Sequence, residues 1–278
     1  MRLDLVIHNE GDIAGESLRA APDFEAMGYD GLWFTDHIIA IEGATGTHAS
    51  YWYEMLSTMA WVAAKTKRVR LGAGVLVAPH RDPLLAAKTI ATIDDLSDGR
   101  FDLGVGTGWA RREFNALGRG DVYEQRGAVT DEALDVMLNA WKGGWIEFDG
   151  QWSKYRKIRF EPHPPSGRIP LWIGARGLGG APMRRAAKYA DYWHPTGVTP
   201  DEIREGGAKL DEMAGRKVQR SARVRFDGDA GQMADLLAQY KDAGCVQVAC
   251  CFDEPETLAD FRRASERFLE AARKVVPA

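Results

Sequence analysis

Residues 69–106 read VRLGAGVLVAPHRDPLLAAKTIATIDDLSDGRFDLGVG, a succession of strand, helix and strand patterns. The run at 69–77 is rich in valine and leucine, as is typical of a buried strand. From Asp82 onward, apolar residues recur every three or four positions, which predicts an amphipathic helix. Gly99 ends that helix, because glycine readily adopts the left-handed conformation found after a last turn, and RFDLGVG begins the next strand. The stretch therefore predicts a parallel β-α-β unit.

The same alternation of short apolar runs and longer amphipathic segments extends over the whole chain. It predicts eight strands: LDLVIH from Leu3, DGLWFTDH from Asp30, VRLGAGVLV from Val69, RFDLGVG from Arg100, PLWIGA from Pro170, DYWHP from Asp191, ARVRF from Ala222 and CVQVACCF from Cys245. Eight such strands joined by helices predict a single α/β domain over residues 1–278, closed as a (β/α)8 TIM barrel. Pro22 falls inside the expected first helix, so that helix must begin late or kink.

One segment, residues 144–169, breaks the alternation. It reads GWIEFDGQWSKYRKIRFEPHPPSGRI, with Asp149-Gly150 flanked by aromatic and β-branched residues. Asp-Gly is a strong short-range hairpin signal. We therefore expect a β-hairpin insertion in the barrel at this point rather than a linker between two domains.

The composition excludes several classes of function. Lys and Arg total 36 against 40 Asp and Glu, and no basic stripe is long enough for a nucleic-acid backbone, so no nucleic-acid partner is expected. The N-terminus fits neither a signal peptide nor a membrane span, which favours a cytoplasmic protein without a membrane partner. Cys245, Cys250 and Cys251 lack the CxxC spacing of a zinc or redox site, so we expect core packing and no metal.

Active sites of such barrels lie at the carboxyl ends of the strands, so candidate residues are sought there. Asp36 and His37 end the second predicted strand. A carboxylate beside an imidazole offers one group that can bind a heterocycle and another that can exchange a proton near neutral pH. A histidine that caps a helix would give the same pattern.

Glycines interrupt the next two strand ends. Gly72 and Gly74 lie within a β-branched run and indicate either a bulge facing a flat ring or close packing of neighbouring strands. The run GVGTGW at 104–109 lacks the third glycine of the dinucleotide fingerprint, but it offers backbone N–H groups, a threonine hydroxyl and an indole. After the fifth strand, GARGLGG at 174–180 precedes a helix and predicts phosphate binding, with a merely flexible loop as the alternative.

Together these blocks resemble the luciferase-like oxidoreductase superfamily over nearly the whole chain. The most specific block is 69–118, and 28–37, 170–175 and 184–195 support it. The superfamily contains enzymes that use reduced FMN with oxygen and enzymes that use the 5-deazaflavin coenzyme F420 for hydride transfer. The GTGW-xxx-EF-xALG form at 106–118 looks most like the deazaflavin branch.

The resemblance implies a role for each matching residue. Asp36 would hydrogen-bond the deazaflavin ring, and His37 would exchange a proton with the substrate. The Gly74-Val75 peptide would form a bulge, often cis, behind the ring. The remaining cofactor contacts would come from Val77, Ala78, Gly106, Thr107, Gly108, Ala175, Arg176, Gly177, Gly179 and Gly180.

Two positions depart from the pattern of the superfamily. Trp109 stands where sugar-phosphate-oxidising relatives carry a catalytic glutamate, which argues against that reaction. Arg112 replaces an asparagine that faces the cofactor, so its contact with cofactor or substrate stays open. Trp109, Trp52 and Tyr53 are expected to wall the substrate pocket, although core packing would equally explain the aromatic run at 51–53.

The expected activity is hydride transfer between coenzyme F420 and a small hydrophobic or conjugated organic substrate. One alternative is a two-component monooxygenase that receives reduced FMN from a partner reductase. Another is a flavin- or deazaflavin-binding protein without turnover. The resemblance further implies a homodimer, with a flavin or deazaflavin reductase as a candidate partner.

Overall fold

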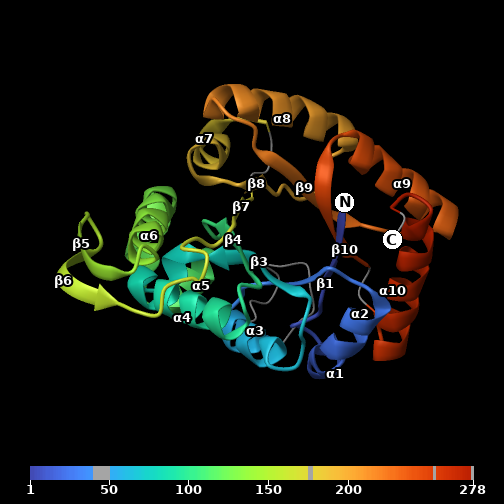
Figure 1. The fold of residues 1–278 in the computed structure, drawn as a ribbon, viewed down its shortest axis with the longest axis horizontal. Helices are drawn as coiled ribbons and strands as arrows, with labels where there is room; N and C mark the ends of the chain where they lie inside the picture. Colours follow the sequence, from blue (N-terminus) through green and yellow to red (C-terminus); the bar gives the residue numbers. More distant parts are fainter. Residues whose placement is uncertain (40–50, 175–177, 253–254, 277–278) are drawn as a thin grey trace.

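The barrel is closed by eight parallel strands in the computed structural model, which describes residues 1–39, 51–174, 178–252 and 255–276. Their order around the barrel is β1-β10-β9-β8-β7-β4-β3-β2. The bounds are Arg2–Val6 (β1), Gly31–Phe34 (β2), Arg70–Val77 (β3), Phe101–Gly106 (β4), Leu171–Ile173 (β7), Tyr192–Trp193 (β8), Gln219–Arg225 (β9) and Cys245–Cys251 (β10). Each predicted strand is confirmed, and Figure 1 shows the strands enclosed by helices.

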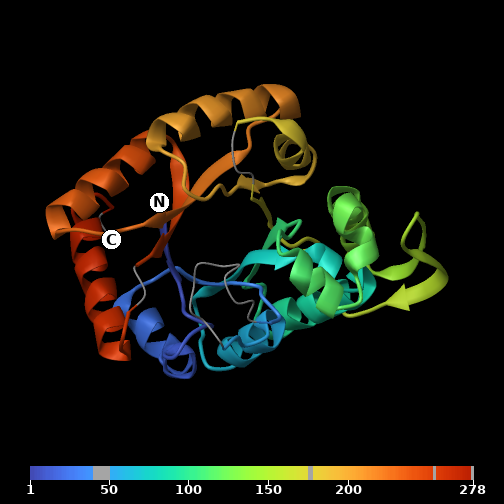
Figure 2. The ribbon, with the colours of Figure 1, turned by 180° about the vertical axis from the view of Figure 1, so that it is seen from behind.

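Helices cover the outside of the barrel on all sides seen in Figures 1 and 2. They are α1 (Ala14–Arg19), α2 (Ala21–Met27), α3 (Met55–Ala63), α4 (Pro83–Leu96), α5 (Arg111–Ala116), α6 (Arg126–Ala140), α7 (Gly180–Tyr189), α8 (Pro200–Ala214), α9 (Ala230–Asp242) and α10 (Leu258–Arg273), with short 3-10 turns at Ala78–His80 and Gly120–Gln125. Pro22 lies in the first turn of α2, where a backbone N–H would have no acceptor within the helix, so proline is tolerated. The expected break therefore takes the form of two helices that meet at Ala20.

The predicted insertion is an antiparallel hairpin of β5 (Gly144–Asp149) and β6 (Lys154–Phe160). It projects from the barrel at the left of Figure 1. Ile146 and Phe160 anchor it, because both side chains are buried in the main hydrophobic core.

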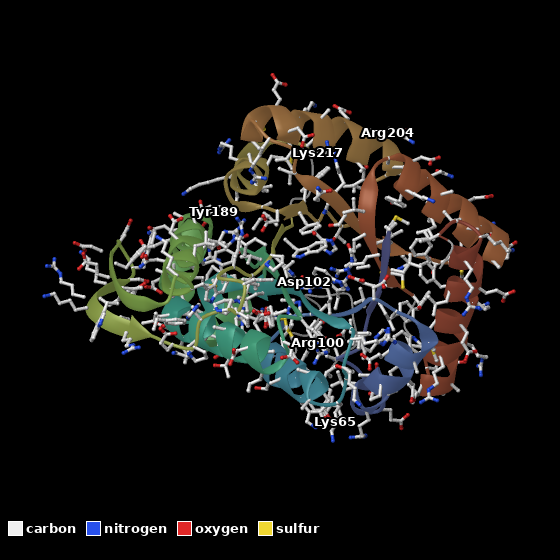
Figure 3. The ribbon with its side chains drawn as sticks, in the orientation of Figure 1. Lys65, Arg100, Asp102, Tyr189, Arg204 and Lys217 are labelled. Carbon is white, nitrogen blue, oxygen red and sulfur yellow. The ribbon has the colours of Figure 1, made fainter. Side chains whose placement is uncertain are left out.

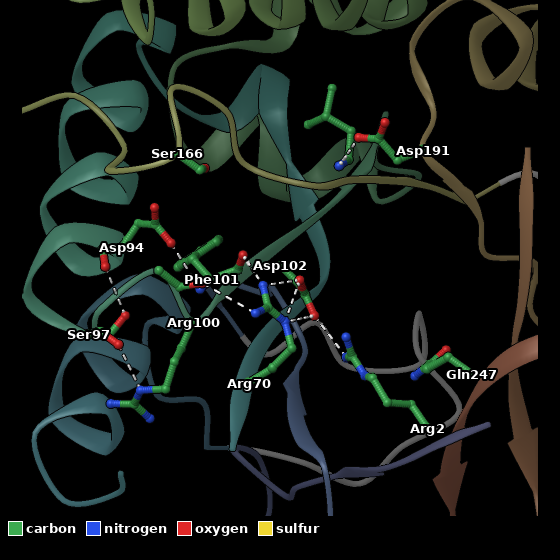
Figure 4. Close-up of polar contacts among 12 residues, drawn as sticks. Arg2, Arg70, Asp94, Ser97, Arg100, Phe101, Asp102, Ser166, Asp191 and Gln247 are labelled. Atoms are coloured by element: carbon green, nitrogen blue, oxygen red, sulfur yellow. Dashed lines mark hydrogen bonds and ion pairs between the residues drawn. The ribbon is translucent and has the colours of Figure 1, made fainter. Parts of the chain in front are cut away.

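A charged layer fills the amino end of the barrel interior (Figure 4). Arg2 and Arg70 both bind the buried Asp102 carboxylate, at 2.8 and 2.6 Å. Gln247 and the Trp33 indole donate hydrogen bonds of 2.8 and 2.7 Å to Asp4, which also binds Arg2. These ion pairs and hydrogen bonds occupy the amino end of the barrel interior, whereas the pocket lies at the carboxyl ends of the strands.

Charged groups elsewhere follow the usual division between core and surface. Figure 3 shows Lys65 and Arg204 on the periphery, whereas Asp102 lies near the centre of the molecule.

Cys245 and Cys250 are buried free thiols, and burial raises the pKa of Cys245 to about 12. Core packing of these two cysteines is thus confirmed, and Cys251 is partly buried beside them.

Candidate active site

A pocket of about 400 Å³ opens at the carboxyl ends of β2, β3, β4 and β7. This is the end at which barrel enzymes carry their sites, and the volume lies within the range of ligand pockets. The pocket brings together the predicted residues Asp36, His37, Gly74, Val75, Val77, Gly106, Thr107, Gly108 and Trp109. Thr35 and Gly174, which belong to the strand-end stretches singled out in the sequence, also line it. The pocket further contains residues to which the sequence assigned no role: Glu113, His194, Thr196 and Arg223.

His37 forms a pair with Glu113, which reaches the pocket from α5. The Nδ1 atom of His37 lies 3.0 Å from Oε2 of Glu113, and the Ile38 N–H donates to Oε1 at 2.9 Å. Burial alone would raise the pKa of Glu113, but these hydrogen bonds hold it below its ordinary value. An ionised carboxylate can only accept, so Nδ1 carries the proton and Nε2 faces no described protein partner. His37 is thus oriented to exchange a proton with a ligand.

Two tryptophans pack around the imidazole of His37. Its ring centroid lies 4.6 Å from Trp52 and 6.0 Å from Trp109. The indole N–H of Trp52 is buried and has no hydrogen-bond partner among the described residues. Trp109 is about half exposed, with 52% of its surface accessible, so it stands at the mouth of the pocket.

The Asp36 carboxylate is buried and already bound to the protein. It accepts hydrogen bonds from both terminal nitrogens of Arg81, at 2.5 and 2.7 Å, and from the Val77 N–H at 2.8 Å. Arg81 also donates to Glu54 at the start of α3, at 2.8 Å. Asp36 therefore ties the end of β2 to the end of β3, and the Val77 N–H is not available to a ligand.

The end of β3 is irregular, and glycines in β3 and in the neighbouring β4 allow close contacts there. The Gly74-Val75 peptide bond is cis, as the resemblance implied, and the pairing of β3 with β4 shifts register between Ala73 and Leu76. A Cβ atom at Gly72 would overlap the Trp33 ring, which confirms close packing for that glycine. At Gly106 a Cβ atom would lie 2.6 Å from the Val75 side chain, inside the pocket.

The inner wall of the pocket carries His194 and Arg223. His194 stacks on Trp33 with centroids 4.7 Å apart, and its Nδ1 lies 2.9 Å from the Ser221 hydroxyl. Burial and the charge of Arg223 lower the pKa of His194 to about 3, so its imidazole is neutral. Arg223 donates to the carbonyl oxygen of Gly74 at 3.2 Å.

Comparison with known proteins identifies the family. The model for luciferase-like monooxygenases matches residues 5–244. The chain belongs to the luciferase-like monooxygenase family. The superfamily resemblance seen in the sequence is therefore confirmed.

Relatives in this family carry out more than one reaction. The chain is 32% identical over 268 residues to the pyrimidine monooxygenase RutA of Methylobacterium radiotolerans, which covers 90% of this chain and 68% of that protein. It is 35% identical over 157 residues to the F420-dependent glucose-6-phosphate dehydrogenase of Nocardia farcinica, covering 55% and 45%. The fold matches an F420-dependent secondary alcohol dehydrogenase, solved with an F420-acetone adduct, with a TM-score of 0.83 at 18% identity over 99% of this chain and 98% of that one.

Some predicted residues of this luciferase-like chain lie outside the pocket. Tyr53 lines a separate groove of about 360 Å³ with Trp61, and its hydroxyl accepts from Tyr51 at 3.0 Å. Ala78 is buried in the short 3-10 turn after β3, and Arg112 is exposed on α5. Of the three aromatic residues expected around a substrate, the structure thus brings Trp52 and Trp109 to His37 but not Tyr53.

The glycine-rich loop is described only in part. Ala175, Arg176 and Gly177 lie outside the described residues, whereas Gly179 and Gly180 begin α7. No side chain among the described residues caps the first turn of α7. Over the described ranges, no cluster of three or more His, Cys, Asp or Glu is placed to hold a metal, and no helix is long and apolar enough to cross a membrane.

Proposed function

We propose that the protein transfers a hydride between coenzyme F420 and a small hydrophobic or conjugated organic substrate. The observation that carries this proposal is the His37–Glu113 pair, which faces a glycine-lined pocket beside the irregular end of β3. The 35% identity to an F420-dependent dehydrogenase supports the choice of coenzyme. When bound, the coenzyme supplies a carbon that gives or takes the hydride, a chemistry that side chains cannot provide.

The residues present fit a flat ring with a phosphate-bearing tail. Gly74, Gly106 and Gly174 all line the pocket, and a side chain at Gly106 or Gly174 would occupy the space beside Val75. The uncapped start of α7 presents N–H groups of the kind that bind phosphate. We propose that the ring lies in the glycine-lined pocket and that Gly179 and Gly180 belong to the phosphate loop.

In this proposal each protein group has a separate task. Nε2 of His37 gives the substrate its proton, and the Glu113 carboxylate fixes the imidazole tautomer and stabilises its charged form. Trp52 and Trp109 exclude water from the reacting atoms. Asp36, whose side chain is fully buried and already accepts three hydrogen bonds, holds the β3 bulge in place.

A fluorescence titration of the purified protein with coenzyme F420 and, separately, with FMN tests the choice of coenzyme. Saturable quenching of the deazaflavin, with FMN binding at least about tenfold weaker, is expected. Tight FMN binding without deazaflavin binding would overturn the proposal. The variant His37→Ala should lose about 100-fold or more in hydride transfer while its coenzyme affinity stays within about threefold.

A two-component monooxygenase that uses reduced FMN is the second candidate, because the match to RutA covers 90% of this chain. It would need a partner reductase, whereas the first candidate needs a source of reduced deazaflavin. Oxygen consumption that depends on reduced FMN and on an added substrate would favour this second function.

A binding protein without turnover would bind a coenzyme but show neither reaction. Assembly as a homodimer is part of the same proposal and is measurable by light scattering.

A further inference from the structure

Arg223 is a cation inside the pocket whose hydrogen-bonding capacity is mostly unused. It projects from β9 and donates one hydrogen bond, from Nη1 to the Gly74 carbonyl oxygen at 3.2 Å. A guanidinium carries five N–H donors. Across the described ranges, no carboxylate forms an ion pair with it and no second acceptor is recorded. Its other donors therefore face the pocket.

The two acids that line the pocket have protein partners of their own. Arg81 neutralises Asp36, and Glu113 is paired with His37. His194 is neutral, since burial and Arg223 lower its pKa to about 3. The nearby His8 is neutral as well, because burial and Arg223 lower its pKa to about 4.

Glu10 is the remaining acid near this wall. Its carboxyl group accepts a hydrogen bond from the Thr35 hydroxyl at 2.9 Å. Burial raises its pKa, while the Thr35 hydrogen bond and the charge of Arg223 act in the opposite direction. No ion pair between Glu10 and Arg223 occurs in the described structure. Among the described residues, the guanidinium of Arg223 therefore has an acid in its surroundings but no carboxylate within ion-pair distance.

The nitrogens of Arg223 are not among the buried polar atoms that lack a partner, and the residue lines the pocket, so a bound oxyanion could form charge-assisted hydrogen bonds with them. Arginine is suited to this, because its planar fork matches the two oxygens of a carboxylate. Thr196 pairs with Arg223 through the backbone and lines the same pocket, so a hydroxyl lies close to the cation. A charged donor and a neutral donor thus occur together on one wall.

We propose that Arg223 is an oxyanion subsite and that the enzyme takes small conjugated substrates carrying a carboxylate or an equivalent anionic oxygen. This deepens the proposed function and rests on it for the identity of the reaction, but the subsite itself is argued from the protein residues alone. A coenzyme ring also carries oxygens that can bear negative charge. The test therefore measures the substrate and the coenzyme in separate arms.

The first arm is calorimetric titration of the full chain with benzoate and with benzyl alcohol, which share a ring and differ in charge. Benzoate should bind wild type at least about tenfold more tightly than the alcohol. Arg223→Met should weaken benzoate about 30-fold and leave the alcohol within about twofold, with Arg223→Lys intermediate. Arg204→Met, which removes a peripheral positive charge on α8, is the matched control and should change neither affinity.

The second arm repeats the coenzyme F420 titration on the same variants, where the affinity should stay within about threefold. If Arg223→Met weakens coenzyme binding but not benzoate binding, the cation serves the coenzyme and the substrate assignment is overturned. Equal binding of benzoate and benzyl alcohol by wild type also overturns it. A benzoate preference that survives while coenzyme F420 fails to bind would refute the proposed function alone. If Arg223→Met does not fold, the test rests on Arg223→Lys, which retains a cation. This variant should still bind benzoate more weakly than wild type, and unchanged benzoate binding would overturn the subsite.

Discussion

In the proposed function Glu113 acts through His37, so the charge of Glu113 is the property to remove. Glu113→Gln keeps the size of the side chain but no longer stabilises a positive imidazole. We expect kcat to fall about 100-fold, with KM and coenzyme affinity within about threefold, in steady-state assays. Glu124→Gln, at an exposed acid paired with Arg111 after the same helix, should leave kcat unchanged. An unchanged kcat in Glu113→Gln would remove the pair from the mechanism.

Arg81 has a structural task that differs from that of Glu113. Arg81→Met would leave the buried Asp36 carboxylate without its counter-ion. The expected loss in free energy of unfolding, measured with urea, is about 3 kcal/mol. Adding Asp36→Asn should recover part of that loss, because no charge then remains buried. A loss below about 1 kcal/mol in the single variant would show that solvent or another group compensates Asp36.

Single residues of the site were predictable only where they stand next to a strand end. Asp36 and His37 are adjacent in sequence and end β2, so the barrel rule was enough to find them. Glu113 lies 76 positions from His37, and only the fold brings the two together. Arg223 belongs to a strand with arginines at 220 and 225 as well, and only the strand register shows which of them reaches the pocket.

The close contact between β3 and β4 requires a glycine at position 104, because a side chain there would collide with β3. A Cβ atom at Gly104 would collide with the Ala73 carbonyl oxygen, which is backbone and cannot swing away. Gly104→Ala should lower the free energy of unfolding by about 2 kcal/mol or more, measured by urea or thermal unfolding. Gly179→Ala is the matched control, since its φ of −172° suits any residue and no atom lies within 4 Å of the added Cβ. Equal stability of the two variants would contradict this account of β3 and β4.

Most strands were predictable because they are short apolar runs between turn signals, whereas β9, which reads QRSARVR, was found from its place in the alternation of strands and helices. Their lengths were less predictable. The run DYWHP from Asp191 forms only Tyr192–Trp193, and Pro195, which has no N–H, lies beyond its end. In the hairpin, the Gly150 N–H donates to the Ser153 carbonyl oxygen, so the connection is longer than a two-residue Asp-Gly turn.

Acid stability of the whole barrel should depend on His194. Its pKa is about 3 in the folded chain, through burial and then the charge of Arg223, against 6.5 as the ordinary value. Between these values the unfolded chain binds a proton that the folded chain does not, so stability falls as pH falls below about 6.5. His194 should account for a loss of about 2 kcal/mol between pH 6.5 and pH 5. In His194→Gln, urea unfolding at the two pH values should lack this part of the loss, and an unaltered pH dependence would refute it.

Because a layer of charged side chains occupies the amino end of the barrel and the pocket lies at the carboxyl end, the candidate site lies at one end only. Arg2, Arg70 and Asp102 occupy the closed end, whereas the pocket at the other end carries the paired His37 and Glu113. Fold class and the position of this site were predictable from the order of strands and helices, because barrel enzymes share them. The coenzyme was not, because the family includes both an F420-dependent dehydrogenase and a monooxygenase among its matches.

Isotope transfer tests the central claim most directly. Reduced coenzyme F420, deuterated at its hydride-carrying carbon, is incubated with the protein and a panel of conjugated carbonyl compounds and carboxylates under ¹⁸O-labelled oxygen. Mass spectrometry of the products should find one deuterium and no ¹⁸O. Products that contain ¹⁸O and no deuterium would contradict hydride transfer as the function of this pocket.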